Sequence, residues 1–200
     1  MVRNLHLLLF LLPTGIFMAG CGQPQIQPPS SPLFSDQIIR DPHFKGKASL
    51  HPLVEQPGYR LRLQQNDKNS GKDLYIPDAV FRFEQADIDG DGSTDLLLGI
   101  YKRTHFEPTP AKRLQILRID AGHLRPLWLG STLCQELVDF RPLSTGNTVR
   151  VLTLEKEVGG TYCNGLYAWQ DFGLRLISYP NKKVDYTNAH HYFNHENNPG

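Results

Sequence analysis

The chain has 200 residues, of which 40% are hydrophobic and 20% are charged, and its formal net charge is +1. This length suits one domain together with a targeting segment, and the apolar content is sufficient for a hydrophobic core. The near-zero charge argues against nucleic acid as a partner.

The first 20 residues have the pattern of an export signal. Arg3 supplies a short positive start, and residues 7–18 are mostly apolar but interrupted by proline and glycine. Such a stretch is too short for a membrane-spanning helix and is typical of a cleaved signal peptide.

The end of this segment, Met18-Ala19-Gly20-Cys21, resembles the lipobox of bacterial lipoproteins, with Met18 where Leu is usual. The resemblance implies that Cys21 carries fatty-acid chains such as palmitate, becomes the mature N-terminus and anchors the chain in a membrane. By the same resemblance, Gly22 favours the outer membrane, with the protein facing the periplasm. The alternative is an ordinary signal peptide in which Cys21 occurs by chance.

Residues 21–42 are polar and rich in proline, which predicts a semi-extended tether between the lipid and a folded domain. The domain is expected over residues 43–182. Its first part has little periodicity, so residues 37–58 are expected to be irregular. Residues 59–63 alternate in the manner of a strand, and residues 65–72 are expected to form a polar loop.

From residue 78 the pattern becomes regular, with short apolar or alternating segments separated by turn residues. It predicts strands at residues 80–84, 95–101, 113–119, 124–129, 137–143, 148–155, 165–170 and 174–179. Asp87 and Asp139 are 52 residues apart, and Asp120 and Asp171 are 51 apart. The sequence therefore predicts two four-stranded units, at about residues 78–130 and 135–180, which is the size of a propeller blade.

An acidic loop separates the first two strands of the first of these units. Calcium binds six to eight oxygens, and alternate side chains of a tightly curled loop can point at one centre. Gly92 permits the sharp turn. The residues predicted to bind one structural Ca²⁺ are Asp87, Asp89, Asp91, Ser93 through its carbonyl, and Asp95. The alternative is a solvated turn without metal.

This loop, followed by apolar residues and Gly99, resembles the calcium loop of FG-GAP/VCBS repeats of integrin-like β-propellers. In that family the loop joins the first two strands of a blade. An EF-hand or a dockerin loop requires an acid at the twelfth position, where this chain has Leu98. Asp139 is the one acid retained in the second unit, so a single metal site is expected.

The predicted fold class is all-β, with two four-stranded antiparallel blade-like units, or three if residues 48–77 supply another. A closed propeller needs at least about four blades. The units are therefore expected to pack directly on one another as an incomplete propeller or a sandwich. The alternative is an open array that a partner or a second copy completes.

Basic residues gather around the loop that follows the second predicted strand. Lys102, Arg103, Lys112 and Arg113 could form a patch that binds anions or polysaccharide. The alternative is a solvated strand edge, where positive charge prevents edge-to-edge aggregation. Trp128 and Trp169, at matching ends of the two units, are expected to be core residues.

Two cysteines besides Cys21 remain, and both would face an oxidising compartment. Cys134 and Cys163 could form a disulfide there, or could remain free thiols. The polar tail, residues 183–200, contains His190, His191 and His195. It is expected to be disordered, although His191 and His195 would share one face of a helix and imidazole binds transition metals.

The chain carries none of the common catalytic motifs, including nucleophile elbows, phosphate-binding loops and zinc-protease helices. The sequence therefore favours a non-enzymatic envelope lipoprotein, stabilised by calcium, that binds an envelope protein or a glycan. The alternative is an enzyme, or an accessory subunit of one, acting on surface polysaccharide.

Overall fold

The computed structural model describes residues 34–196, except for residues 67, 106, 131 and 147. The predicted export signal, Cys21 and the tether up to residue 33 lie outside these residues. Within the described part, no helix has the length and apolar character needed to cross a membrane.

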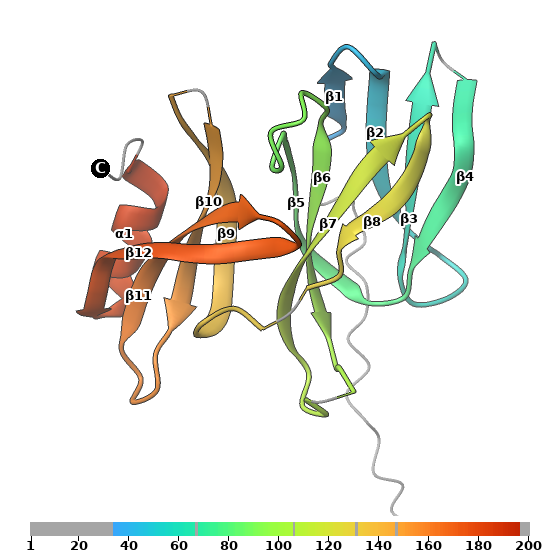
Figure 1. The fold of residues 1–200 in the computed structure, drawn as a ribbon. Coiled ribbons are helices and arrows are strands. Elements are labelled where there is room, and N and C mark those ends of the chain that lie inside the picture. The colour runs from blue at the N-terminus through green and yellow to red at the C-terminus, as the bar shows by residue number, and fades with distance from the viewer. Residues whose placement is uncertain (1–33, 67, 106, 131, 147, 197–200) are drawn as a thin grey trace, which may run out of the picture.

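The described strands form three four-stranded antiparallel sheets, each with its strands adjacent in chain order (Figure 1). The first contains β1 (Gln37–Arg40), β2 (Lys45–Pro52), β3 (Tyr59–Gln65) and β4 (Lys68–Ile76). The second contains β5 (Ala79–Ala86), β6 (Asp95–Lys102), β7 (Ala111–Asp120) and β8 (His123–Trp128). The third contains β9 (Glu136–Thr145), β10 (Thr148–Lys156), β11 (Tyr162–Gln170) and β12 (Gly173–Val184), and is followed by the helix α1 (Tyr186–His195).

The all-β prediction is confirmed, and the number of blade-like units is three. The additional sheet contains the predicted strand at residues 59–63 as part of β3, whereas β1, β2 and most of β4 come from residues that were expected to be tether, irregular or loop. In β2 only Ala48 and Leu50 are both apolar and buried, which is too short an alternation to identify a strand alone. Pairing with β3 makes this segment a strand, and Asn66, with φ of 49°, turns the chain from β3 toward β4. β1 likewise falls within the predicted tether.

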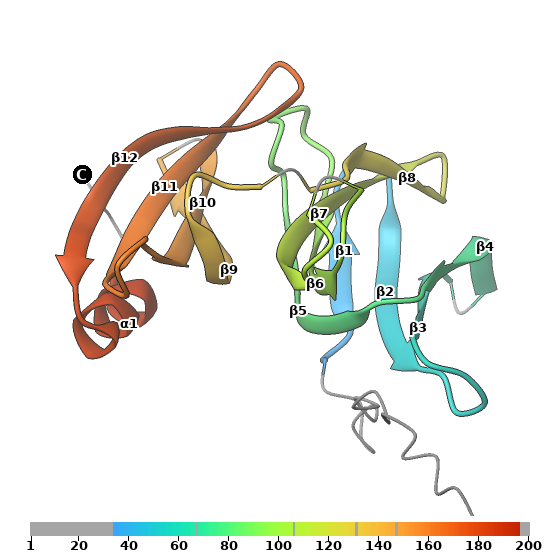
Figure 2. The ribbon, with the colours of Figure 1, turned by 90° about the horizontal axis from the view of Figure 1, so that it is seen from below.

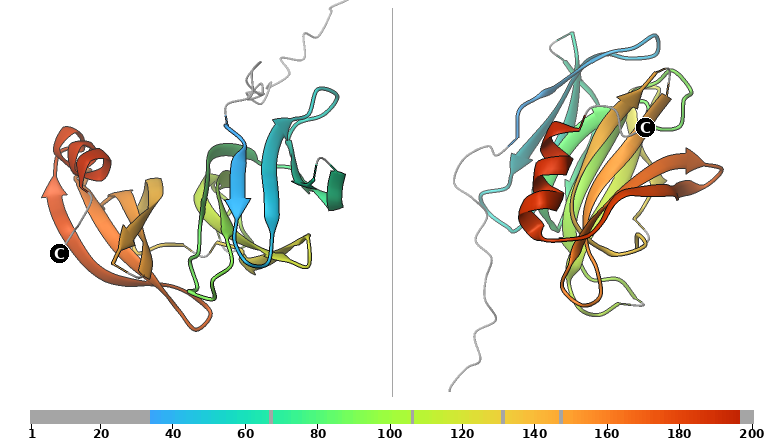
Figure 3. Two further views of the ribbon diagram at one scale, coloured as in Figure 1. Left: turned by 90° about the horizontal axis from the view of Figure 1, so that it is seen from above. Right: turned by 90° about the vertical axis from the view of Figure 1, so that its left-hand side faces the viewer.

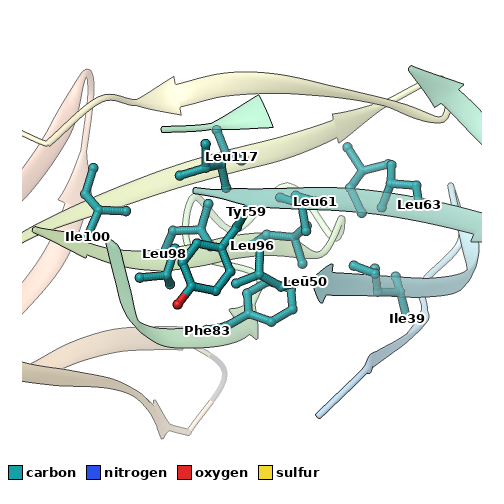
Figure 4. Close-up of a cluster of buried hydrophobic side chains, with 14 of the residues drawn as sticks. Ile39, Leu50, Tyr59, Leu61, Leu63, Phe83, Leu96, Leu98, Ile100 and Leu117 are labelled. Carbon is teal, nitrogen blue, oxygen red and sulfur yellow. The ribbon is translucent and has the colours of Figure 1, made fainter. Parts of the chain in front are cut away.

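The three sheets are stacked face to face in chain order, and α1 lies on the far side of the third (Figures 2 and 3). One hydrophobic cluster fills the space between the first and second sheets, with Leu50 and Leu61 on one side and Leu96 and Leu98 on the other (Figure 4). A second cluster joins the second and third sheets, and a third joins the third sheet to α1. The sheets therefore pack directly on one another, as expected.

The stacking explains why two strands contain runs of residues that are buried on both faces. In β6, Leu96 and Leu98 belong to the first cluster and Leu97 to the second. In β10, Val151 belongs to the second cluster and Leu152 to the third. A strand with a buried layer on both faces has no position where a polar side chain would reach water.

The repeat between the second and third sheets is less regular than the aspartate spacing indicated. Asp87 follows β5, whereas Asp139 lies inside β9, where it pairs with Arg82 of β5 across the two sheets. The Arg82 Nε and Asp139 Oδ1 atoms are 2.5 Å apart, and a second pair of atoms makes the contact bidentate. Asp139 is thus a residue that joins two sheets, and residues 144–147, at the end of β9 and in its connection to β10, include no acidic residue in the sequence.

The tail that was expected to be disordered contains α1. Asp185 caps its start by accepting a hydrogen bond from the backbone N–H of Asn188. Ala189 and Phe193 are buried against the third sheet. A polar ten-residue segment with two buried side chains has little helical signal of its own, so tertiary packing makes it a helix.

Candidate metal centre

The acidic loop connects β5 to β6 within the second sheet, where the sequence placed it. Ala86 and Asp95 are cross-strand partners at its base. Between them, the buried side chain of Ile88 packs into the cluster between the second and third sheets. The loop is therefore held at its base by backbone pairing and by one apolar anchor.

Hydrogen bonds from the backbone to carboxylates curl the loop. Asp87 accepts from the N–H groups of Gly90 and Gly92, at 2.8 and 3.0 Å. Asp95 Oδ2 accepts from the N–H of Ile88 at 3.1 Å. Gly92 has φ of +83°, which is unfavourable for a residue with a Cβ, so its glycine is required by the backbone. These contacts turn successive carboxylates toward the inside of the loop.

Three of the predicted ligands come together. One carboxylate oxygen each from Asp87, Asp89 and Asp95 lies within 4.8 Å of the other two. Asp91 is not a member of this group; its exposed carboxylate accepts from the N–H of Ser93 at 2.8 Å. The structure thus places Asp87, Asp89 and Asp95 around one centre, while Asp91 is exposed and bonded to the N–H of Ser93.

The loop is electrostatically short of positive charge. Burial, and then the charges of Asp89, Asp91 and Asp87, raise the pKa of the Asp95 carboxyl to about 7. The nearest cationic group is Arg118 of β7, whose guanidinium lies 2.7 Å from Asp89 Oδ2 and 3.7 Å from Asp91 Oδ2. One arginine faces four carboxylates, so the site fits a divalent cation that accepts hard oxygen ligands.

Two contributors to this site were missed from the sequence. Arg118 is the cross-strand partner of Asp95 in the β6–β7 pair, which brings it beside the loop. Asp41, in the turn between β1 and β2, accepts a hydrogen bond from Thr94 N–H at 2.8 Å and so ties the loop to the first sheet. The sequence offers a local signal only for the turn at Asp41. In the segment Asp41-Pro42-His43-Phe44, the Asp41 carboxylate also accepts from the N–H groups of His43 and Phe44, as an aspartate at the start of a turn commonly does.

The four residues of the predicted basic patch do not form one free surface. Arg113 is only 3% exposed and is paired with Glu107 and Thr132. Lys112 Nζ donates to the carbonyl oxygen of Val138 on the third sheet and lies 4.7 Å from the centre of the Phe81 ring. Of the remaining two, Arg103 is exposed and Lys102 is half-buried. Lys112 and Arg113 are therefore contacts within the fold.

The remaining sequence predictions concern the tryptophans and the cysteines. Trp128 and Trp169 both pack against the cluster between the second and third sheets, as expected for core residues. Cys134 and Cys163 are free thiols in the structure, so the disulfide that the sequence left open is not formed in it. Burial raises the pKa of the Cys163 thiol to about 12, which disfavours its reactive thiolate.

Comparison of the chain with protein-family models, with curated proteins and with solved structures finds no match. The fold and the acidic loop are therefore the basis for inferring function.

Proposed function

We propose that the protein is a non-enzymatic lipoprotein of the bacterial cell envelope. Its stacked sheets would be stabilised by one calcium ion and would present a surface to an envelope protein or a glycan. The observation that carries this proposal is the convergence of Asp87, Asp89 and the buried Asp95 on one centre. The resemblance of the loop to FG-GAP/VCBS calcium loops supports the same ion.

The proposed role of calcium is structural. The loop joins β5 to β6, Arg118 contacts it from β7, and Asp41 contacts it from the first sheet. An ion bound there would neutralise carboxylates that repel one another and would hold these elements together. The acids of this loop would not serve in catalysis, because they would be committed to the ion and to loop N–H groups.

The partner surface would lie on the outer side of the first sheet. Among the described layers, the second sheet, the third sheet and α1 all lie on the other side of this sheet (Figure 2). Side chains on strands β2 to β4 that alternate with the core positions include Lys47, His51, Arg60, Arg62 and Tyr75. Lys47 pairs with Asp36, and Arg60 and Arg62 pair with Asp73, so this face would offer paired charges and an aromatic ring to a polar protein surface or a glycan.

A calcium titration of thermal unfolding tests the proposal. Calcium at about a hundred times its dissociation constant should stabilise the fold by about 2.7 kcal/mol, which raises Tm by roughly 5 °C or more. Asp89→Asn should abolish this rise. Asp171→Asn is the matched control, because Asp171 is exposed in the β11–β12 turn, at φ of 52°, where Asn is equally tolerated.

The proposal fails if calcium leaves the Tm of the parent protein unchanged. It also fails if Asp171→Asn reduces the calcium response as much as Asp89→Asn does.

The alternative function is an enzyme or accessory subunit that acts on polysaccharide. The observation in its favour is a cavity of about 280 Å³ lined by residues that include Glu107, Arg113, Gln135 and Glu136. Glu107, however, is already bonded to Arg113 and Thr132, which leaves it poorly suited to general acid–base chemistry. Sugar release from a polysaccharide by the parent protein, lost in Glu136→Gln, would favour this alternative.

A further inference from the structure

The outer face of α1 carries a second group of metal-ligating side chains. Ala189 and Phe193 turn inward to the third sheet, and His190, His191 and His195 are exposed to solvent. His191 and His195 are four residues apart, so they lie one above the other on the same face of the helix. This pair is remote in the chain from the acidic loop and contributes nothing to it.

The two imidazoles are already adjacent. The centres of the His191 and His195 rings are 4.3 Å apart, and the ring planes are inclined by 19°. The spacing of four residues is the one by which a helix presents two imidazoles to a single zinc ion in metalloproteases. Because a nitrogen lone pair lies in the plane of its ring, the two stacked rings would have to rotate for both to bind one ion.

The protonation of His195 is fixed by a hydrogen bond. Its Nδ1 lies 2.9 Å from the backbone carbonyl oxygen of His191, and a carbonyl can only accept, so Nδ1 carries the proton. The lone pair is then on Nε2, at the outer end of the ring. A ring N–H donated to a backbone carbonyl is the usual outer-shell support of a metal-binding histidine.

His190 is engaged in a different set of contacts. Its ring stacks on Tyr186, with ring centres 5.3 Å apart and planes inclined by 25°. The side-chain amide of Asn194 lies 3.1 and 3.2 Å from its two ring nitrogens. His190 therefore belongs to the neighbouring row of the helix and serves as an internal control.

We propose that His191 and His195 form a site for a divalent transition-metal ion of the zinc class. Imidazole nitrogen suits zinc, nickel and copper, whereas calcium prefers the hard oxygens of the acidic loop, so the two sites would select different ions. Two protein ligands leave further coordination positions to water or to another molecule. The ion would therefore exchange readily, unlike one in a four-ligand structural site.

Zinc binding to the full-length chain, in detergent and with saturating calcium to fill the acidic loop, tests the proposal. Calorimetry should show a zinc site in the parent protein that becomes weaker by on the order of tenfold or more in His191→Asn and in His195→Asn. His190→Asn should bind zinc as the parent protein does. Cys134 is present in all four proteins, so zinc bound by its thiol does not affect the comparison.

A second measurement identifies the imidazole nitrogens that bind the zinc ion. In spectra that correlate imidazole nitrogens with ring protons, zinc should shift the Nε2 signals of His191 and His195 and leave those of His190 in place. The proposal is overturned if His191→Asn binds zinc as tightly as the parent, if His190→Asn loses as much affinity, or if the Nε2 signals do not move.

Discussion

Glu155 of β10 is the buried acid whose ionisation should make stability depend on pH. Its side chain is fully buried, and it accepts a hydrogen bond from the Thr153 hydroxyl at 2.6 Å. Burial raises the pKa of the Glu155 carboxyl above its ordinary value of 4.5. Because the folded state holds this proton more tightly than the unfolded state, the stabilisation is complete below pH 4.5 and is lost as the pH rises through the folded-state pKa.

Glu155→Gln removes this ionisation and keeps an oxygen for Thr153. Between pH 4 and pH 8, the variant should lose less free energy of unfolding than the parent protein, by about 1.4 kcal/mol for each unit of pKa shift. Urea unfolding across that range measures the difference, with Glu136→Gln as the exposed control. The pKa of Asp95 is also raised in the folded state, so Asp95 too makes stability fall as the pH rises. Asp95 is present in all three proteins and therefore does not affect the comparison. Parallel pH profiles for the parent and Glu155→Gln would contradict the prediction.

Single residues also show where the sequence was and was not informative about the site. The carboxylates of Asp87, Asp89 and Asp95 could be identified because their spacing within one loop is local. Arg118 and Asp41 could not, since they reach the loop through strand pairing and through packing of the first sheet. Gly99 is similar: a Cβ there would lie 2.6 Å from the Phe81 ring, a contact that only the folded sheet creates.

Among the elements, α1 depends most on its neighbours. Phe193 is 2% exposed, with the guanidinium of Arg141 5.7 Å and that of Arg82 5.9 Å from its ring centre. Arg141 Nε also donates to the Phe193 carbonyl oxygen at 2.6 Å, and the Asn164 amide donates to that of Ala189 at 3.1 Å. One apolar side chain and several polar contacts thus hold the helix on the third sheet.

Phe193→Ala should therefore reduce the free energy of unfolding by ~3–5 kcal/mol, through lost burial and the cavity left behind. Urea unfolding monitored by circular dichroism measures this change. Thr187→Ala, on the exposed side of the helix, should stay within about 0.5 kcal/mol of the parent. If Phe193→Ala also stays within that margin, α1 contributes nothing to the stability of the third sheet.

The strands divide into those the sequence could and could not predict. β5 to β12 have alternating or continuously apolar patterns bounded by turn residues, which are local signals. β1, β2 and β4 are rich in polar residues. Their strand conformation comes from pairing, of β2 and β4 with β3 and of β1 with β2, and from covering the second sheet. The unit that forms the first sheet was consequently predicted from the sequence only as an alternative.

At the scale of the whole molecule, the stack has two different ends. The N-terminal segment joins it at β1 in the first sheet, and α1 closes it beyond the third sheet (Figure 3). If Cys21 carries lipid, the 15 residues from Gly22 to Asp36 connect the membrane to the first sheet. A polar, proline-rich segment of this kind would allow the stack to stand away from the membrane surface.

The proposed lipid anchor at Cys21 predicts where the whole chain is found after cell fractionation. The parent protein should be recovered with membranes and should enter the detergent-rich phase on phase separation. Cys21→Ala, made with a cleavable export signal that is not lipidated in place of residues 1–20, should move it to the aqueous phase, because a peptide tether without acyl chains has no membrane affinity of its own. Cys134→Ala is the control that retains the anchor. Recovery of the Cys21→Ala chain in the detergent phase would rule out the lipid.

The helix α1 covers the end of the described stack that lies beyond the third sheet. In an array of stacked units each buries a face against the next, and the last unit needs a neighbour of another kind. Here a helix of ten residues is that neighbour, and Ala189 and Phe193 occupy the face on which a fourth sheet would pack. A unit added at this end of the stack would have to enter between Val184 and Asp185, so that the helix moves outward with the new end.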